Sequence, residues 1–195
     1  MLGLVNGLII TRLRTEPLIA TLATSFIYGS IATALAGDNP PSGFPDSFNR
    51  LGTGAFGDVI PFQILLFAVA ALLFSLLISR SIFGRKIIMI GYNAEAARYS
   101  GIRVARIVTC AYVISGLMAG LAGIVLAAYY SAVRPDMGDL LLLSTITIVV
   151  LGGVRIFGGD GTISGVVIAV LLLGVLRQGM PVSYTHLTLP TIYSV

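Results

Sequence analysis

The feature that most constrains the fold is a run of nineteen residues, 61–79, in which only Gln63 and Ser75 are polar before the final Ser79. A helix of this length, rising about 1.5 Å per residue, crosses the ~30 Å hydrocarbon core of a bilayer. Only 10% of the 195 residues are charged, whereas a soluble domain has about 25%. The apolar residues come in long blocks without the alternation of barrel strands. The sequence therefore predicts an all-α integral membrane protein, a polytopic helical bundle.

Four further apolar blocks complete the predicted bundle. The five spans are expected at about 17–36, 61–79, 107–130, 140–154 and 162–176. The segment between the first two is rich in glycine and proline and carries Asp38, Asp46 and Asp58 against a single basic residue. An acidic, turn-rich loop belongs outside the cell, whereas basic loops stay inside. Residues 80–106 hold six of the twelve Lys and Arg residues, so this segment is expected on the cytoplasmic side.

The side chains that carry catalysis or bind metals are scarce in this chain. One histidine and eight scattered carboxylates show no spacing typical of a catalytic triad or a metal site, and no phosphate-binding glycine loop with its lysine is present. The single Cys110 excludes an internal disulfide. Basic residues without interleaved aromatics do not favour a nucleic-acid partner. We therefore predict a non-enzymatic protein without a metal or cofactor.

A polar island within the basic segment has the pattern of a short capped helix. Its predicted residues are Asn93, Glu95, Ala96, Ala97, Arg98 and Gly101. Asn93 is a good N-cap, Glu95 favours the first turn, and Gly101 is placed for a left-handed C-cap. Arg98 has the spacing to pair with Glu95. So short a helix is unstable alone in water. It either rests on its own bundle, which physical reasoning favours, or docks on a cytosolic partner.

This island resembles the cytoplasmic coupling segment of sugar-type ABC importer permeases, the family of the ribose, xylose, galactose, rhamnose and autoinducer permeases. The stretches that resemble the family, in the family's order within residues 1–180, are 3–7, 19–24, 95–102, 115–123, 150–153, 157–159 and 161–162. The resemblance implies a permease subunit that imports a monosaccharide or sugar-like solute by alternating access. It also implies that the island sits in a groove of a separate ATPase subunit.

The resemblance further implies the surroundings of the protein. Its partners would be a cytosolic ATPase subunit, a second permease chain and a periplasmic or lipid-anchored solute-binding protein, in the plasma (inner) membrane of a bacterium. Family members are longer, so we expect a fragment that lacks both ends. Residues 181–195, with two prolines and His186, show no apolar periodicity and are predicted to be a non-native tail. A branched-chain amino-acid permease and a non-transport scaffold subunit remain as alternatives.

Small and hydroxyl-bearing residues recur at helical spacing in the predicted spans. The glycines expected to let helix backbones approach are Gly116, Gly120 and Gly123. The hydroxyls that share helix faces are Thr21, Thr24, Ser25 and Tyr28 in one span and Ser144 and Thr147 in another. These side chains either line a translocation path or form hydrogen bonds between helices, and we favour the second interpretation.

Overall fold

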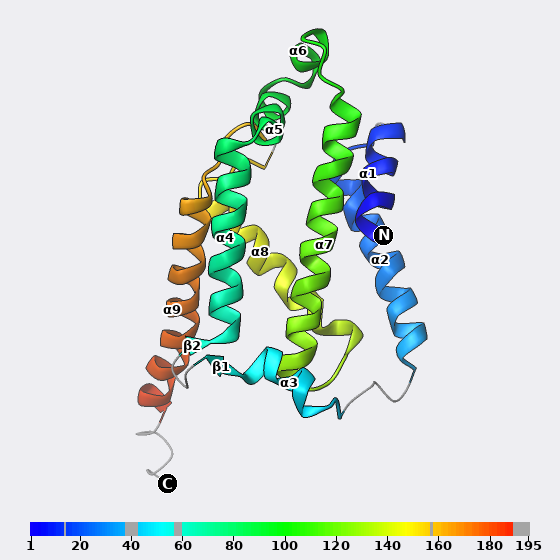
Figure 1. The fold of residues 1–195 in the computed structure, drawn as a ribbon. Coiled ribbons are helices and arrows are strands. Elements are labelled where there is room, and N and C mark those ends of the chain that lie inside the picture. The colour runs from blue at the N-terminus through cyan, green and yellow to red at the C-terminus, as the bar shows by residue number, and fades with distance from the viewer. Residues whose placement is uncertain (14, 38–42, 57–59, 157, 189–195) are drawn as a thin grey trace.

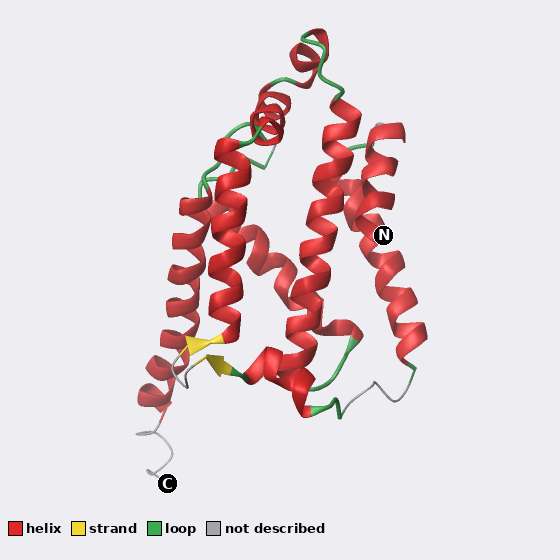
Figure 2. Ribbon diagram, viewed as in Figure 1, coloured by secondary structure: helices red, strands yellow, loops and turns green. Residues whose placement is uncertain are grey.

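The structure is a computed structural model that describes residues 1–13, 15–37, 43–56, 60–156 and 158–188. Helices dominate it (Figure 1). They are α1 (Leu2–Leu13), α2 (Pro17–Ala36), α3 (Asp46–Thr53), α4 (Phe62–Arg80), α5 (Ile82–Tyr92), α6 (Ala94–Tyr99), α7 (Val104–Tyr130), the 3-10 helix Pro135–Gly138, α8 (Asp139–Leu151) and α9 (Ile163–Thr188). Figure 2 shows two short strands, β1 (Ala55–Phe56) and β2 (Ile60–Pro61), which pair antiparallel. The predicted all-α fold class is confirmed.

Three helices, α2, α4 and α7, are long and apolar enough to cross a membrane. They lie where spans were expected at 17–36, 61–79 and 107–130. By contrast, α8 has 13 residues and reaches only about 20 Å, less than the hydrocarbon core. It ends at Gly152, and Gly153 follows with a φ of +78°, so the backbone turns before a full crossing. The span expected at 140–154 is thus a shorter helix.

The last helix extends further than the sequence indicated. We expected it to end near residue 176, but α9 continues to Thr188 and so enters the segment predicted to be a non-native tail. A proline inside a helix removes one backbone donor, and the helical backbone here continues through Pro181. Residues 189–195 lie outside the described part of the chain, as do Asp38, Asp58 and Phe157 of the sequence predictions.

The segment expected to be a plain loop before the second span contains α3 and the β1–β2 hairpin. Pro45 precedes the helix, and Asp46 lies in its first turn, where a negative charge is favourable. Packing then holds it: a Cβ at Gly52 would lie 2.2 Å from the Tyr129 nitrogen, so α3 presses on the end of α7. The Gln63 side chain donates to the Gly52 carbonyl at 2.5 Å. A helix of eight residues depends on such contacts, which the local sequence does not reveal.

The basic segment also holds one helix more than expected. The α5 helix begins after Ser81, whose Oγ accepts a hydrogen bond from the Gly84 nitrogen at 3.0 Å. A Cβ at Gly84 would lie 2.1 Å from the Ile78 carbonyl oxygen, so the chain turns sharply between α4 and α5. Arg85 and Lys86 interrupt the apolar residues of α5, so this helix was not predicted from the sequence.

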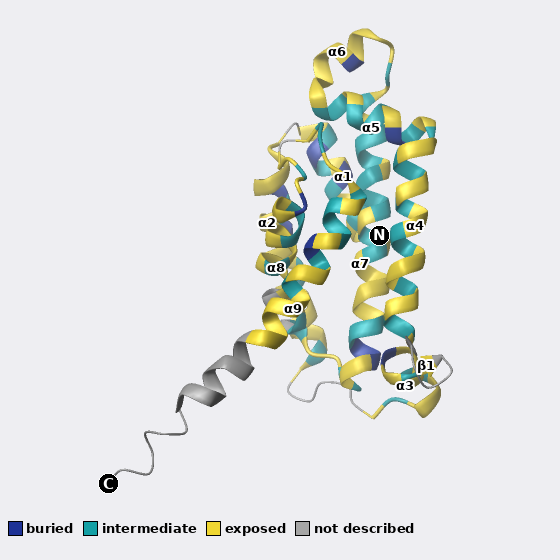
Figure 3. Ribbon diagram, turned by 90° about the vertical axis from the view of Figure 1, so that its left-hand side faces the viewer, coloured by how far each residue is buried: buried dark blue, intermediate teal, exposed yellow. Residues whose placement is uncertain are grey.

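Helix packing within the described residues depends on small side chains. The buried apolar residues are Ile10, Ala20, Ala97, Ala127, Ala128 and Ala169. Large apolar side chains point outward: Phe26 is 75% exposed, and no residue of α4 is buried. Figure 3 shows these exposed residues along the long helices. An apolar outer surface of this kind suits a hydrocarbon environment rather than water.

The two ends of the bundle differ in character. At one end lie α5, α6 and the connection between α8 and α9, and at the other lie α3, β1 and β2 (Figure 1). We call the first the basic end, because α5, α6 and the residues that flank them carry six cations, namely Arg80, Arg85, Lys86, Arg98, Arg103 and Arg106.

Candidate functional site

The helix α6 forms the tip of the basic end (Figure 1), and its start is fixed by Asn93. The Asn93 side-chain oxygen accepts hydrogen bonds from the Glu95 and Ala96 nitrogens, each at 3.0 Å. The Asn93 backbone is extended, with φ −159° and ψ 104°, as an N-cap requires. One residue therefore ends α5 and starts α6, and the predicted N-cap is confirmed.

The end of α6 is fixed by Gly101. This glycine has a φ of +79°, in the left-handed region. Its nitrogen donates to the Arg98 carbonyl at 3.0 Å, and the Ile102 nitrogen donates to the Ala97 carbonyl at 3.1 Å. These two bonds form a Schellman motif, which satisfies carbonyls at a helix end. The predicted left-handed C-cap is confirmed. No atom lies within 4 Å of a Cβ at Gly101, so conformation rather than space favours glycine here.

Only one residue of α6 is buried. Ala97 is 2% exposed and is the buried residue of this helix, whereas Tyr99 is 88% exposed. Figure 3 shows the rest of α6 as exposed. Of the six predicted residues, the five other than Ala97 are exposed. The expected pair of Glu95 and Arg98 is not among the ion pairs of the described residues, which is consistent with the small energy of exposed pairs.

A second loop packs against the C-terminal end of α5, next to α6 along the chain. We call the described residues 152–156 and 158–162 the glycine turn. Gly153, Gly158 and Gly159 in it have positive φ values. A Cβ at Gly91 would lie 2.2 Å from the Gly159 nitrogen, so the end of α5 touches the turn backbone to backbone. The glycines of this cluster allow the chain to turn, and only the structure shows that the turn contacts α5.

A polar network joins the same two segments. The Tyr92 hydroxyl donates to Asp160, and Asp160 forms an ion pair with Arg155 at 3.1 Å. Within the turn, the Arg155 nitrogen donates to the Asp160 carbonyl at 3.0 Å. The hydrogen bond to Asp160 and the charge of that carboxylate raise the pKa of Tyr92 above its ordinary value of 10.0, while Arg155 acts in the opposite direction.

The predicted path hydroxyls mostly bond within their own helices. Thr21 and Thr24 donate to carbonyls three and four residues earlier, at 2.9 to 3.1 Å. Ser25 donates to the Leu22 carbonyl at 2.7 Å, and Thr147 to the Leu143 carbonyl at 2.8 Å. Two groups reach another helix: Tyr28 donates to Asn6 at 3.2 Å, and Ser144 accepts from Arg177. A role for the six in a path stays a prediction.

The predicted packing glycines occupy different surroundings. A Cβ at Gly116 would lie 2.9 Å from the Gly3 Cα, so this glycine lies in the contact between α1 and α7. Gly120 and Gly123 have no atom within 4 Å of such a Cβ. Gly3 and Gly7, four residues apart on α1, meet α7 closely as well. Their spacing is that of the small-residue pairs that let helices approach, although neither was among the predicted packing glycines.

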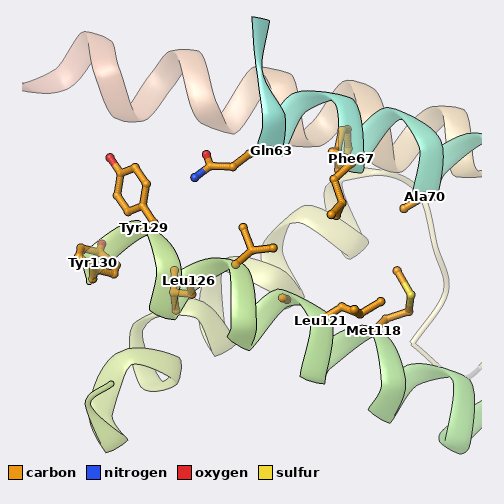
Figure 4. A pocket seen from close by; sticks show the side chains of 11 residues that line it. Gln63, Phe67, Ala70, Met118, Leu121, Leu126, Tyr129 and Tyr130 are labelled. Carbon is orange, nitrogen blue, oxygen red and sulfur yellow. The ribbon is translucent and has the colours of Figure 1, made fainter. Parts of the chain in front are cut away.

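A groove of about 490 Å³ runs between α4 and α7 (Figure 4). Its lining includes Gln63, Phe67, Ala70, Met118, Leu121, Leu126, Tyr129 and Tyr130. Most of these side chains are apolar, and the polar groups of Gln63 and Tyr129 lie toward one end of it (Figure 4). None of the six predicted path hydroxyls belongs to this lining. Among the described residues, no group of three or more His, Cys, Asp or Glu side chains is placed to hold a metal ion.

Long apolar helices joined at a basic end by a short capped helix define a polytopic α-helical membrane protein. The chain matches, over residues 1–194, the family described as branched-chain amino acid transport system / permease component. It belongs to this family of ABC importer permeases. The match reaches into residues 181–194, and the prediction that these are non-native stays a prediction.

Relatives of the chain are described more narrowly than the family. It is 37% identical, over 184 residues, to the autoinducer 2 import system permease protein LsrD of Yersinia enterocolitica. The same protein of Yersinia pseudotuberculosis and that of Salmonella typhi are also 37% identical. Each alignment covers 91% of this chain and 55% of the relative, so the chain spans about half the length of the curated relatives it matches. The sugar-type branch is thereby supported. No solved structure matches the chain.

Proposed function

We propose that this chain is the membrane-spanning part of an ATP-driven importer for a sugar-like solute of the autoinducer-2 kind, in the plasma (inner) membrane of a bacterium. The observation that carries the proposal is the 37% identity to autoinducer 2 permeases along 91% of the chain. The family description names branched-chain amino acids, which is the basis for a second candidate solute. The relatives favour the sugar-like solute.

We further propose that α6 couples solute movement to a cytosolic ATPase subunit. Both ends of the helix are capped, and five of its six predicted residues are exposed at the tip of the basic end. Ala97, by contrast, is buried, and the helix contacts α5 and α7. A short helix held between α5 and the long α7 can pass a rigid-body movement to a membrane span. The exposed set for this contact is Asn93, Glu95, Ala96, Arg98 and Gly101.

Two further partners belong to the proposal. A second permease chain would cover apolar surface, and the uncovered Gly120 and Gly123 on α7 together with the exposed α4 support such a contact. A periplasmic or lipid-anchored solute-binding protein would meet the end that carries α3 and the hairpin, opposite α6 (Figure 1). In this arrangement solute enters at one end while ATP is hydrolysed at the other.

The test uses the complete transporter, reconstituted in vesicles with its ATPase subunits and binding protein. Labelled autoinducer 2, ribose and leucine serve as three probes. We expect ATP-dependent uptake of autoinducer 2 or ribose and none of leucine. Uptake of leucine alone would favour the second candidate. Binding of the ATPase subunit is measured separately by copurification, with Arg98→Glu as the test variant and Arg50→Glu on α3, at the opposite end, as the matched control.

A further inference from the structure

The orientation of α6 needs a support that its own contacts do not supply. The helix has six residues, and Ala97 is its one buried side chain. Asn93 is the single residue between α5 and α6. Its nitrogen donates to the Met89 carbonyl at 3.1 Å, and its side-chain oxygen accepts a hydrogen bond from the Glu95 nitrogen of α6. The C-terminal end of α5 therefore sets the direction of α6.

The C-terminal end of α5 is held by the glycine turn. A Cβ at Gly91 would lie 2.2 Å from the Gly159 nitrogen and 2.8 Å from its Cα. Real Cβ atoms do not approach backbone so closely, so any side chain at position 91 would displace the turn. At Gly159, with a φ of +94°, a Cβ would lie 3.3 Å from the Gly91 carbonyl carbon. Both sides of this contact therefore favour glycine.

A directional polar contact accompanies the backbone contact. Tyr92 donates to Asp160, which Arg155 holds from the other side at 3.1 Å. The Arg155 and Asp160 side chains are 69% and 39% exposed, so water and salt screen their charges. The network therefore selects the position of the Tyr92 ring more than it adds binding strength.

Backbone contacts join the glycine turn to α8 and α9. The Val154 nitrogen donates to the Val149 carbonyl at 3.1 Å, which ties the turn to the end of α8. A Cβ at Gly165 would lie 2.2 Å from the Gly152 carbonyl oxygen, so α9 leaves the turn in tight contact with α8. A displacement of the turn is thus transmitted to both helices.

We propose that Gly91 and Tyr92 are positioning residues that lock the C-terminal end of α5 to the glycine turn, so that α6 moves together with α8 and α9. In this arrangement α6 is connected to two parts of the bundle. It is connected to α7 through the chain that follows Gly101, and to α8 and α9 through α5 and the glycine turn. The consequence for transport rests on the proposed function, whereas the joint movement does not.

The movement is tested with nitroxide labels on the complete transporter in lipid discs. The labels are attached at Ala94→Cys on α6 and Ser164→Cys on α9, both exposed positions, with Cys110→Ser as background. We expect one narrow distance distribution, and a shifted or broader one when Gly91→Ala or Tyr92→Phe is added. Tyr99→Phe is the matched control, because it removes the same hydroxyl from an exposed residue of α6. Unchanged distributions in both test variants would overturn the proposal.

The role in coupling is tested by the ratio of autoinducer 2 uptake to ATP hydrolysis in the same variants. We expect Tyr92→Phe to lower this ratio about two- to five-fold, the range for an exposed polar contact. In an Asp160→Asn background the second change should add little, because both act through one contact. Full additivity, or an unchanged ratio despite a broader distribution, would refute the positioning role. If the unmodified complex takes up no probe, the proposed function fails and the label distances alone decide the joint movement.

Discussion

At the scale of single residues, Gly101 is the position where backbone conformation most directly constrains the candidate site. Its φ of +79° lies in a region that costs other residues roughly 1–2 kcal/mol, and β-branched residues adopt it least readily. The space around it is open, so a substitution would change the end of α6 rather than create a clash. The geometry at the end of α6 therefore depends mainly on the single residue Gly101.

We expect Gly101→Val to impair transport while membrane insertion stays normal, because the strained cap would redirect α6 but leave the apolar spans intact. Uptake of autoinducer 2 and the amount of protein in the membrane fraction are measured together. Ser100→Val is the matched control, since Ser100 is exposed and has an ordinary φ of −78°. Equal uptake by both variants would contradict a special role for the cap.

Tyr92 makes the network sensitive to high pH. Its pKa is raised because the Asp160 carboxylate accepts a hydrogen bond from the Tyr92 hydroxyl and repels the negative charge of a phenolate. A raised pKa means that the folded protein favours the neutral phenol. This contribution is complete below the ordinary value of 10.0 and is lost as the pH climbs through the raised value.

We expect the ultraviolet signal of tyrosinate that disappears in Tyr92→Phe to titrate above pH 10, and to move to lower pH in Asp160→Asn. The difference between each protein and its Tyr92→Phe counterpart isolates this residue from the other seven tyrosines. The contact between α5 and the glycine turn should be unaffected near neutral pH. A midpoint at or below the ordinary value would show that the hydrogen bond does not form in the lipid-bound protein.

At the scale of elements, the contact between α1 and α7 shows how helices without large buried side chains hold together. Gly3 and Gly7 bring the backbones close: a Cβ at Gly3 would lie 2.3 Å from the Tyr112 carbonyl oxygen, and one at Gly7 would lie 3.0 Å from the Thr109 Cα. Dispersion between closely packed backbones replaces the hydrophobic drive that a membrane does not provide.

We expect Gly3→Val to lower stability in detergent by about 1–3 kcal/mol, because the added methyl groups have no room against α7. Gly29→Val on α2 is the matched control, since no atom lies within 4 Å of a Cβ there. Thermal unfolding in the same detergent compares the two variants. A similar loss in both would indicate a general intolerance of valine rather than a close helix contact.

At the scale of the whole molecule, the cations around α5 and α6 and the hairpin with α3 occupy opposite ends of the bundle (Figure 1). This separation predicts the orientation in the membrane, because basic segments are retained on the cytoplasmic side. Ser100, next to α6, and Ser47, on α3, are both exposed and allow a matched pair of cysteine substitutions.

We expect Ser47→Cys to react with a membrane-impermeant maleimide in spheroplasts whose plasma membrane is intact. Ser100→Cys should react only after this membrane is permeabilised. Both are made with Cys110→Ser, because Cys110 is the single native thiol. Labelling from the opposite sides would reverse the orientation and contradict the proposed contact of α6 with a cytosolic ATPase.

Much of the fold and part of the site followed from the sequence alone. The long apolar runs determined the three long spans, and Asn93 and Gly101 determined where α6 begins and ends, because hydropathy and capping act within a few neighbouring residues. The same local reasoning missed α3, since that helix is held by Gly52 against α7 rather than by its own sequence.

Only the tertiary structure decided how these parts meet. It brought Tyr92 to Asp160, 68 residues away along the chain, and set Gly91 against Gly159. It also showed that Gly116 packs on α1, whereas Gly120 and Gly123, which follow it at helical spacing, face open space. The physical reason is that local sequence fixes which face a helix can offer, whereas the crossing of helices, set by all their contacts together, decides which residues touch.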